Sequence, residues 1–184
     1  GVEEDAAAIP AALRLAGKGI EVCLIASTDE PQNANSWLAQ GGIIYKSEEA
    51  DDAKPLAKDI MIAGHDYNSV EAVNFLAKEG PKAVKDLLVD GLGVSFDRHS
   101  TGGRVDEEWD LTKEGGHSRQ RILHSADHTG RTIMEAVRKA VEENPNITLL
   151  QGYTAVDLLT SHHHTIGMTY RYHLENRCCG AYVY

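Results

Sequence analysis

The sequence has few cysteines and no obvious use for them. Only 3 of its 184 residues are cysteine, namely Cys23 and the adjacent pair Cys178 and Cys179. None forms a CxxC spacing, and neighbouring cysteines rarely bridge, so the cysteine pattern favours a reducing, cytoplasmic compartment. Cys23 is expected to be an unreactive residue of a buried strand.

Positive charge is also scarce, since 18 lysines and arginines stand against 28 aspartates and glutamates, a formal net charge of −10. This balance excludes a general surface for nucleic acids or anionic membranes. The sequence shows no secretory signal pattern and no apolar run long enough to span a bilayer, so a soluble protein is expected. Hydrophobic residues make up 42% and charged residues 25%, which is typical of a globular domain with its own core.

The chain begins with a pattern typical of an α/β unit. An alanine-rich helix is predicted over residues 6–16, ended by Gly17 and Gly19, and a short apolar strand is predicted over 20–26. Further helices are predicted over 47–64, 68–79, 81–89 and 129–143, with Gly64, Gly80 and Gly91 as breaks, strands over 147–150 and 155–159, and a β-ribbon over 165–172 and 179–184. Val94, Phe96, Val105 and Trp109 are expected to be buried in an irregular segment.

The densest group of reactive side chains is the segment Glu114–Arg121, with the sequence EGGHSRQR. Arg119 and Arg121 could hold a small dicarboxylate through paired hydrogen bonds, and Glu114 could accept from an ammonium group. The alternative is an exposed charged loop with local capping roles only.

A second candidate is the segment Asn35–Gly42, with the sequence NSWLAQGG. Backbone amides at its paired glycines could approach a flat ligand or a phosphate, although a tight turn into a core strand explains the glycines equally well. His124 and His128 stand four residues apart, but no further ligand completes a zinc spacing, so no metal site is predicted. The run His162–His164 is expected to form a solvated turn.

Taken in order, the segments resemble the flavin-binding region of the L-aspartate oxidases, a family of the succinate dehydrogenase and fumarate reductase flavoprotein superfamily. The resemblance runs from Ala11 to Tyr184 and implies an α/β fold, a partial Rossmann-like FAD-binding domain with additional helices and a β-ribbon. It is carried by AALRLAGKGIEVCLIAS, NSWLAQGGI, LTKEGGHSRQRILHSADHTGRTI, NITLLQGYTAVDLL and CGAYVY.

The resemblance implies FAD as a non-covalent cofactor, because the superfamily members that attach flavin covalently have a histidine where Asn35 stands. It implies that Ser27 and Thr28 meet the adenosine ribose and that Ala155 and Val156 lie beside the adenine. The residues implied to contact the flavin are Asn35, Ser36, Trp37, Leu38, Ala39, Gln40, Gly41 and Gly42.

Glu114 separates the branches of the superfamily, because L-aspartate oxidases carry EGGHS where succinate dehydrogenases and fumarate reductases typically carry FGGQS. The resemblance implies that Glu114 and His117 orient L-aspartate while a hydride passes from its C2 to flavin N5. The product would be iminoaspartate for quinolinate and NAD biosynthesis, with a functional link to quinolinate synthase. Oxygen or fumarate would then reoxidise the flavin.

Two features depart from the family pattern. The glycines of the GxGxxG fingerprint would fall at Glu3, Asp5 and Ala8, and the strand expected before the fingerprint is missing. Acidic residues at the fingerprint positions would repel a phosphate at the helix start. The family chain is also longer, with a capping domain and a C-terminal helical domain that carry its proton-shuttling arginine. Residues 1–184 are therefore expected to form a single truncated domain that is inactive alone. The alternatives are a fragment of a fumarate reductase or succinate dehydrogenase flavoprotein, and a non-catalytic α/β module.

Overall fold

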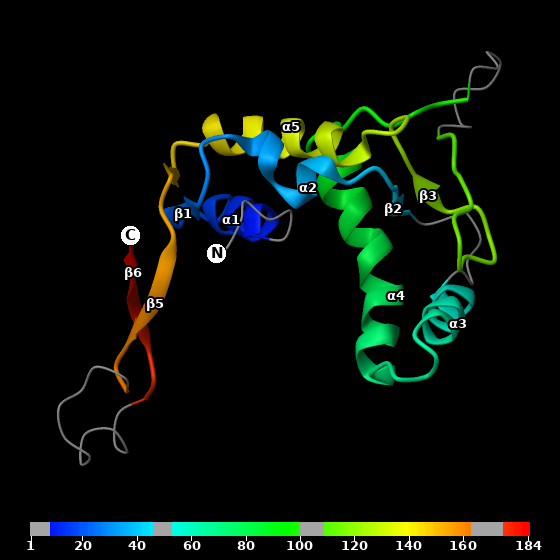
Figure 1. Ribbon diagram of the computed structural model, residues 1–184, viewed down its shortest axis with the longest axis horizontal. Helices are drawn as coiled ribbons and strands as arrows, with labels where there is room; N and C mark the ends of the chain where they lie inside the picture. Colours follow the sequence, from blue (N-terminus) through cyan, green and yellow to red (C-terminus); the bar gives the residue numbers. More distant parts are fainter. Residues whose placement is uncertain (1–7, 46–52, 100–108, 163–174) are drawn as a thin grey trace. The chain divides into compact units, whose positions relative to one another are not determined.

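The computed structural model describes residues 8–45, 53–99, 109–162 and 175–184 (Figure 1). The chain divides into two compact units, which are described separately below. The first unit combines Gly1–Asn35 with Val141–Tyr184, and the second is the continuous segment Ser36–Ala140.

The first unit contains the predicted α/β element. Helix α1 (Ala8–Ala16) precedes strand β1 (Val22–Ala26), which pairs in parallel with β4 (Ile147–Gln151) from Val22↔Ile147 to Ala26↔Gln151. The helix buries Ile9, Ala12 and Ala16, which share one face, and it packs on both strands. The helix and both strands are thus confirmed in the described residues.

The prediction that Cys23 is buried is wrong, because its side chain is exposed. Alternation along β1 puts Val22, Leu24 and the fully buried Ala26 on one face and Cys23 on the other. A sequence-based strand assignment treats both faces as covered, whereas here only one face is well buried.

A β-ribbon completes this unit. Strands β5 (Ala155–Thr160) and β6 (Cys178–Val183) pair antiparallel, and Thr154 and Tyr184 exchange two backbone hydrogen bonds at the open end. The strands predicted over 155–159 and 179–184 are therefore confirmed, and the described ribbon is formed by these two strands. The other predicted ribbon segment, 165–172, lies outside the described residues, as do His163 and His164; His162 lies in the turn after β5 and is half-buried.

The second unit is mostly helical, with one short strand pair. The 3-10 turn Pro31–Asn33 still belongs to the first unit, and α2 (Asn35–Leu38) begins at the last residue of that unit's Gly1–Asn35 segment. Helix α2 leads to β2 (Ile43–Ile44), which pairs antiparallel with β3 (Ile122–Leu123). Helix α5 (Thr129–Glu142) follows β3 and confirms the helix predicted over 129–143. The side chains of Met134, Val137 and Val141 are at most 2% exposed, as its apolar period requires.

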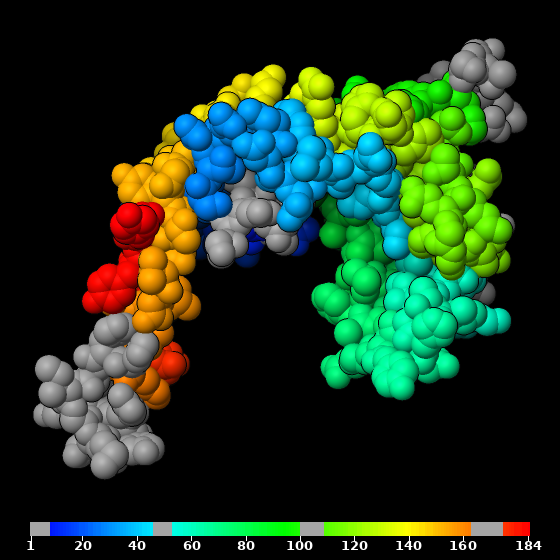
Figure 2. Space-filling view, viewed as in Figure 1, coloured from blue at the N-terminus to red at the C-terminus, as the bar shows by residue number. Residues whose placement is uncertain are grey.

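Helices α3 (Ala53–Ala63) and α4 (Val70–Val84) pack against each other (Figures 1 and 2). The predicted break at Gly80 is wrong, since α4 runs through it and continues as a π-helical segment, η2 (Lys85–Val89). Val73, Ala77 and Pro81 are spaced four apart and all buried, so packing offsets the poor helix propensity of glycine and proline here. Among the described helices, none combines the length and hydrophobicity that crossing a bilayer requires.

The core of the second unit gathers side chains from helices, strands and the irregular segment. Val94 and Phe96 are buried as predicted, and Trp109 is half-buried with its ring edge-on to Phe96 at 6.1 Å between centroids. Val105 lies outside the described residues. The other large contributors are Leu56, Leu88, Ile122 and Leu123.

Candidate functional site

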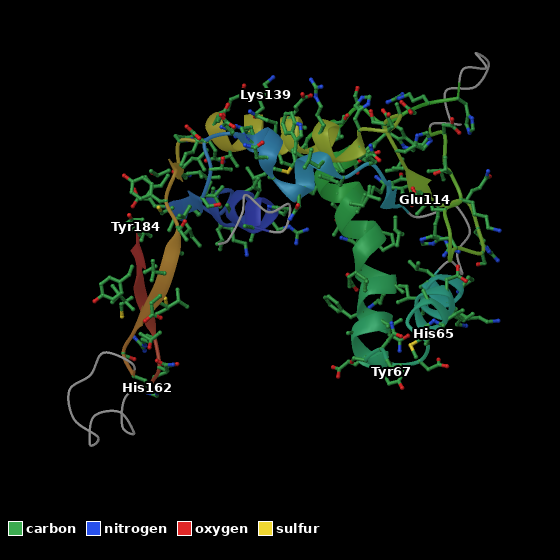
Figure 3. All side chains as sticks on the ribbon, viewed as in Figure 1. His65, Tyr67, Glu114, Lys139, His162 and Tyr184 are labelled. Atoms are coloured by element: carbon green, nitrogen blue, oxygen red, sulfur yellow. The ribbon has the colours of Figure 1, made fainter. Side chains whose placement is uncertain are left out.

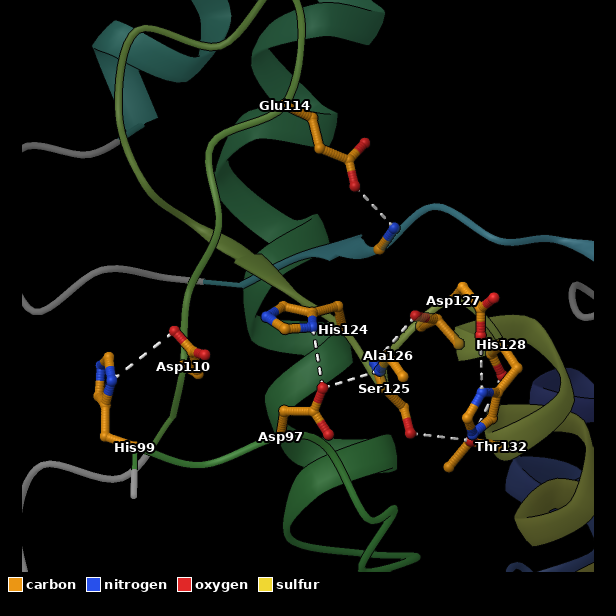
Figure 4. A network of polar contacts seen from close by, with 12 residues as sticks. Asp97, His99, Asp110, Glu114, His124, Ser125, Ala126, Asp127, His128 and Thr132 are labelled. Atoms are coloured by element: carbon orange, nitrogen blue, oxygen red, sulfur yellow. Dashed lines mark hydrogen bonds and ion pairs between the residues drawn. The ribbon is translucent and has the colours of Figure 1, made fainter. Parts of the chain in front are cut away.

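The two segments that the sequence singled out meet in the second unit. We call Ser36–Gly42, the part of the predicted Asn35–Gly42 segment that lies in this unit, the cofactor loop, and we call Glu114–Arg121 the recognition loop. The backbone N–H of Gly42 donates to Glu114 Oε1 at 3.0 Å, joining residues 72 positions apart (Figure 4). Figure 3 labels Glu114 among the side chains of the described residues. The pairing of these motifs could be expected from the resemblance, but the atoms that join them could not.

The β2–β3 strand pair sets this geometry. Ile43 lies opposite Leu123, and the Tyr45 N–H donates to the Arg121 carbonyl at 2.7 Å, so the ends of the two loops run side by side. A Cβ at Gly42 would lie 2.2 Å from Ile122 Cγ2 and 2.3 Å from the Leu123 carbonyl oxygen. Only glycine therefore fits where the cofactor loop enters the strand pair.

The cofactor loop is open to a ligand along most of its length. Leu38, Ala39, Gln40 and Gly41 are exposed, and Leu38 is 62% exposed although it is apolar. A backbone stretch that lacks a side chain at Gly41 admits close approach of a flat group such as an isoalloxazine ring. These residues fit FAD.

The recognition loop forms a tight turn around Gly116. Gly116 has a φ of +83°, which glycine adopts without strain, and the His117 N–H donates to the Glu114 carbonyl at 3.2 Å. Glu114 is exposed, whereas His117 is half-buried. Its Nδ1 is buried and has no hydrogen-bond partner among the described residues.

Arg121 does not face a substrate as the sequence suggested. Its side chain is fully buried, and Nη1 donates to Asp59 Oδ2 at 2.9 Å. The same carboxylate oxygen accepts from the backbone N–H and the hydroxyl of Ser118, each at 2.8 Å. The guanidinium of Arg121 therefore anchors the recognition loop to α3.

Burial would raise the pKa of Asp59, but the hydrogen bonds from Ser118 and Arg121 outweigh it and hold this pKa below the usual 3.8. Asp59 is thus an ionised structural partner. Sequence reasoning missed Asp59 because it lies in α3, 59 residues before Ser118, and no motif includes it.

The histidines near the recognition loop bond to carboxylates. His124 Nδ1 lies 3.1 Å from Asp97 Oδ2, and His128 Nδ1 lies 3.3 Å from Asp127 Oδ1 (Figure 4). Within the described ranges, no three residues of metal-binding type come together.

The predicted cofactor residues outside the cofactor loop belong to the first unit. Ser27 and Thr28 directly follow β1, at the carboxyl end of a parallel strand, where α/β folds bind ligands. The Tyr153 N–H donates to the Ala26 carbonyl at 3.0 Å, which brings the chain just before Ala155 and Val156 to the same strand end. Asn35 also falls in this unit, at the start of α2.

A parallel strand pair with a covering helix, a β-ribbon and a glycine-rich exposed loop defines a mixed α/β nucleotide-cofactor domain. The chain belongs to the FAD-binding domain family, whose model matches residues 6–184. FAD is the cofactor of this family of FAD-dependent oxidoreductases, and the resemblance to L-aspartate oxidases is confirmed by the relatives that follow.

The chain is similar to L-aspartate oxidases from plants and bacteria. It is 37% identical over 150 residues to the chloroplastic enzyme of Arabidopsis thaliana, covering 82% of this chain and 22% of the relative. It is 34% identical over 183 residues to the enzyme of Vibrio cholerae, covering 100% of this chain and 32% of the relative. The chain thus spans about a fifth to a third of these relatives.

Solved structures confirm the fold class. Mycobacterium smegmatis Sdh1 in complex with UQ1 matches with a TM-score of 0.75 at 18% identity, covering 100% of this chain and 30% of that one. The open conformation of a flavocytochrome c3 fumarate reductase matches with a TM-score of 0.72 at 21% identity, covering 98% and 30%. The individual cofactor and substrate residues remain predictions.

Proposed function

We propose that this chain is the FAD-domain portion of an L-aspartate oxidase that converts L-aspartate to iminoaspartate for quinolinate and NAD biosynthesis. The observation that carries the proposal is the hydrogen bond from Gly42 N–H to Glu114 Oε1. It links a loop suited to a flat cofactor with a carboxylate suited to an ammonium group. L-aspartate oxidases among the relatives support the same substrate.

Glu114 has one role for each carboxylate oxygen. Oε1 accepts from Gly42, and both oxygens lie near Gly41, with Oε2 at 3.6 Å and Oε1 at 3.8 Å from where a Cβ of that residue would be. The exposed carboxylate can accept a charge-assisted hydrogen bond from the ammonium of aspartate beside the cofactor loop. Succinate and fumarate carry no ammonium group, so Glu114 selects aspartate.

His117 orients the substrate from the same turn. Its backbone N–H is fixed by the hydrogen bond to the Glu114 carbonyl. The imidazole is half-buried and its Nδ1 is fully buried, so the substrate would meet the exposed part of the ring. FAD, once bound, would supply the hydride acceptor: oxidation at C2 of aspartate would form the C=N bond and release one proton from the substrate nitrogen. Asn35 leaves the cofactor without covalent attachment.

The first test measures cofactor and substrate together in the purified full-length gene product. We expect FAD to bind with quenching of its fluorescence, and we expect L-aspartate to bleach the flavin absorbance under anaerobic conditions. Bleaching by succinate but not by aspartate would assign the protein to the succinate dehydrogenase and fumarate reductase branch. An absence of FAD binding at micromolar protein would favour a non-catalytic module.

The second test changes Glu114 alone. In Glu114→Gln, kcat/KM for aspartate should fall by at least tenfold, because the amide lacks the charge that meets the ammonium. Fumarate reduction should fall much less, since the amide oxygen can still accept from Gly42. Equal losses for both substrates would rule out recognition of the ammonium by Glu114.

A further inference from the structure

The start of α5 touches the backbone of the cofactor loop directly. The Gly130 N–H donates to the Ala39 carbonyl at 2.9 Å. A Cβ at Gly130 would lie 2.2 Å from the Ser36 carbonyl oxygen and 2.7 Å from that of Ala39. Both neighbours are backbone atoms, so any larger residue at position 130 must displace the loop or the helix.

The turn that presents Gly130 is itself held by several hydrogen bonds (Figure 4). The Ser125 N–H donates to Thr129 Oγ1 at 3.0 Å, and the Ala126 N–H donates to Asp97 Oδ2 at 2.7 Å. Ala126 has a φ of +45°, a left-handed conformation that costs a non-glycine residue about 1–3 kcal/mol. The surrounding bonds offset this cost, so the helix start cannot easily move away from an enlarged residue.

A second contact joins the same helix end to the loop. The Arg131 guanidinium lies over the Trp37 ring, 5.7 Å from its centroid, and Arg131 Nε donates to Glu135 Oε1 at 2.8 Å. Glu135 thus holds the cation where it can interact with the ring face. The loop is then fixed near its beginning at Trp37, in its middle at Ala39 and at its end at Gly42.

We propose that Gly130 is a positioning residue for flavin binding, which sets the backbone of the cofactor loop by letting α5 approach it, with Arg131 fixing Trp37. The inference rests on the proposed function, because it takes the Ser36–Gly42 loop as the flavin contact. It goes beyond the proposed function in one respect: flavin binding depends on the start of α5 as well as on the sequence of the cofactor loop.

The test compares Gly130→Ala with Gly80→Ala in the full-length gene product. Gly80 is a matched control in α4, because its Cβ would meet only the flexible Leu76 side chain, at 3.3 Å. We expect Gly130→Ala to weaken FAD binding at least tenfold and to shift the visible flavin band of the residual complex, while Gly80→Ala retains the unmodified affinity and spectrum. An affinity within twofold of the unmodified protein for Gly130→Ala would overturn the inference.

A second variant covers the case in which Gly130→Ala does not fold. In a Trp109→Phe background, Trp37 is the remaining tryptophan and reports on the loop. Arg131→Met should red-shift Trp37 emission and weaken FAD binding, whereas Lys139→Met on the same helix should change neither. Unchanged emission and affinity in Arg131→Met would overturn the inference. A failure of the unmodified protein to bind FAD would instead refute the proposed function, while Trp37 emission would still decide whether α5 fixes the loop.

Discussion

At the residue scale, Asp59 is the polar side chain on which the recognition loop depends. Its Oδ2 accepts from Ser118 and from the fully buried Arg121. Replacing Asp59 by asparagine removes a carboxylate charge from beside the buried Arg121 guanidinium, so we expect the free energy of unfolding to fall by about 3–5 kcal/mol. Urea denaturation followed by circular dichroism measures this loss.

Asp90→Asn is the matched control, because Asp90 pairs with Lys85 at the surface, where ion pairs contribute little to stability. A loss of similar size in both variants would mean that burial of the Asp59 pair does not matter for stability.

The same carboxylate predicts an acid response. Hydrogen bonds hold the pKa of folded Asp59 below its usual 3.8, so the folded state binds fewer protons than the unfolded state in this range. The contribution of Asp59 to stability is therefore complete above pH 3.8 and is lost as the pH falls through the folded pKa. Between pH 5 and pH 3, measured in urea, the unmodified protein should lose more stability than Asp59→Asn. Parallel pH profiles would contradict this assignment.

At the scale of elements, the β2–β3 strand pair depends on a glycine. A Cβ at Gly42 would overlap Ile122 and the Leu123 carbonyl, both of them buried, so Gly42→Ala should cost about 1–3 kcal/mol of stability through overpacking. Gly41→Ala is the control, since its Cβ would meet Glu114 Oε2 at an ordinary 3.6 Å. Thermal unfolding should give a clearly lower Tm for Gly42→Ala than for Gly41→Ala. Equal Tm values would show that the strand pair adapts to the extra methyl group.

The elements that the sequence predicted well are those whose pattern is local. The period of α5 and the apolar runs of β1 and β4 could be identified without any partner. The continuation of α4 through Gly80 could not, because it depends on burial of Pro81 against other elements. Local propensity correctly identifies a weak point there but says nothing about the packing that overrides it.

The candidate site also has a part that could be predicted from the sequence and a part that could not. Its two loops stand out by composition, and the resemblance gives them roles, but the sequence offered Arg121 as a substrate ligand. The structure pairs Arg121 with Asp59, a residue that no motif marks. Gly130 was likewise unremarkable until its backbone was found against Ala39, because close approach is a property of two segments and not of one.

At the scale of the whole molecule, the second unit is an uninterrupted segment between the two parts of the first unit. Asp59, Ser118 and Arg121 all belong to the second unit, whereas the β1–β4 pair belongs to the first. Each unit has buried apolar side chains of its own, as separately opening regions of a protein usually do. We therefore expect the two units to lose hydrogen-exchange protection separately.

Asp59→Asn tests this expectation when exchange is followed by mass spectrometry. Amides of α4 and β3 should exchange faster in the variant, because the destabilised pair lies in their unit. Amides of β1 and β4 should keep their protection, since their parallel ladder involves none of the affected residues. If protection fell equally in both units, the chain would unfold as one cooperative body, and the contribution of Asp59 would extend to the strands next to Ser27 and Thr28.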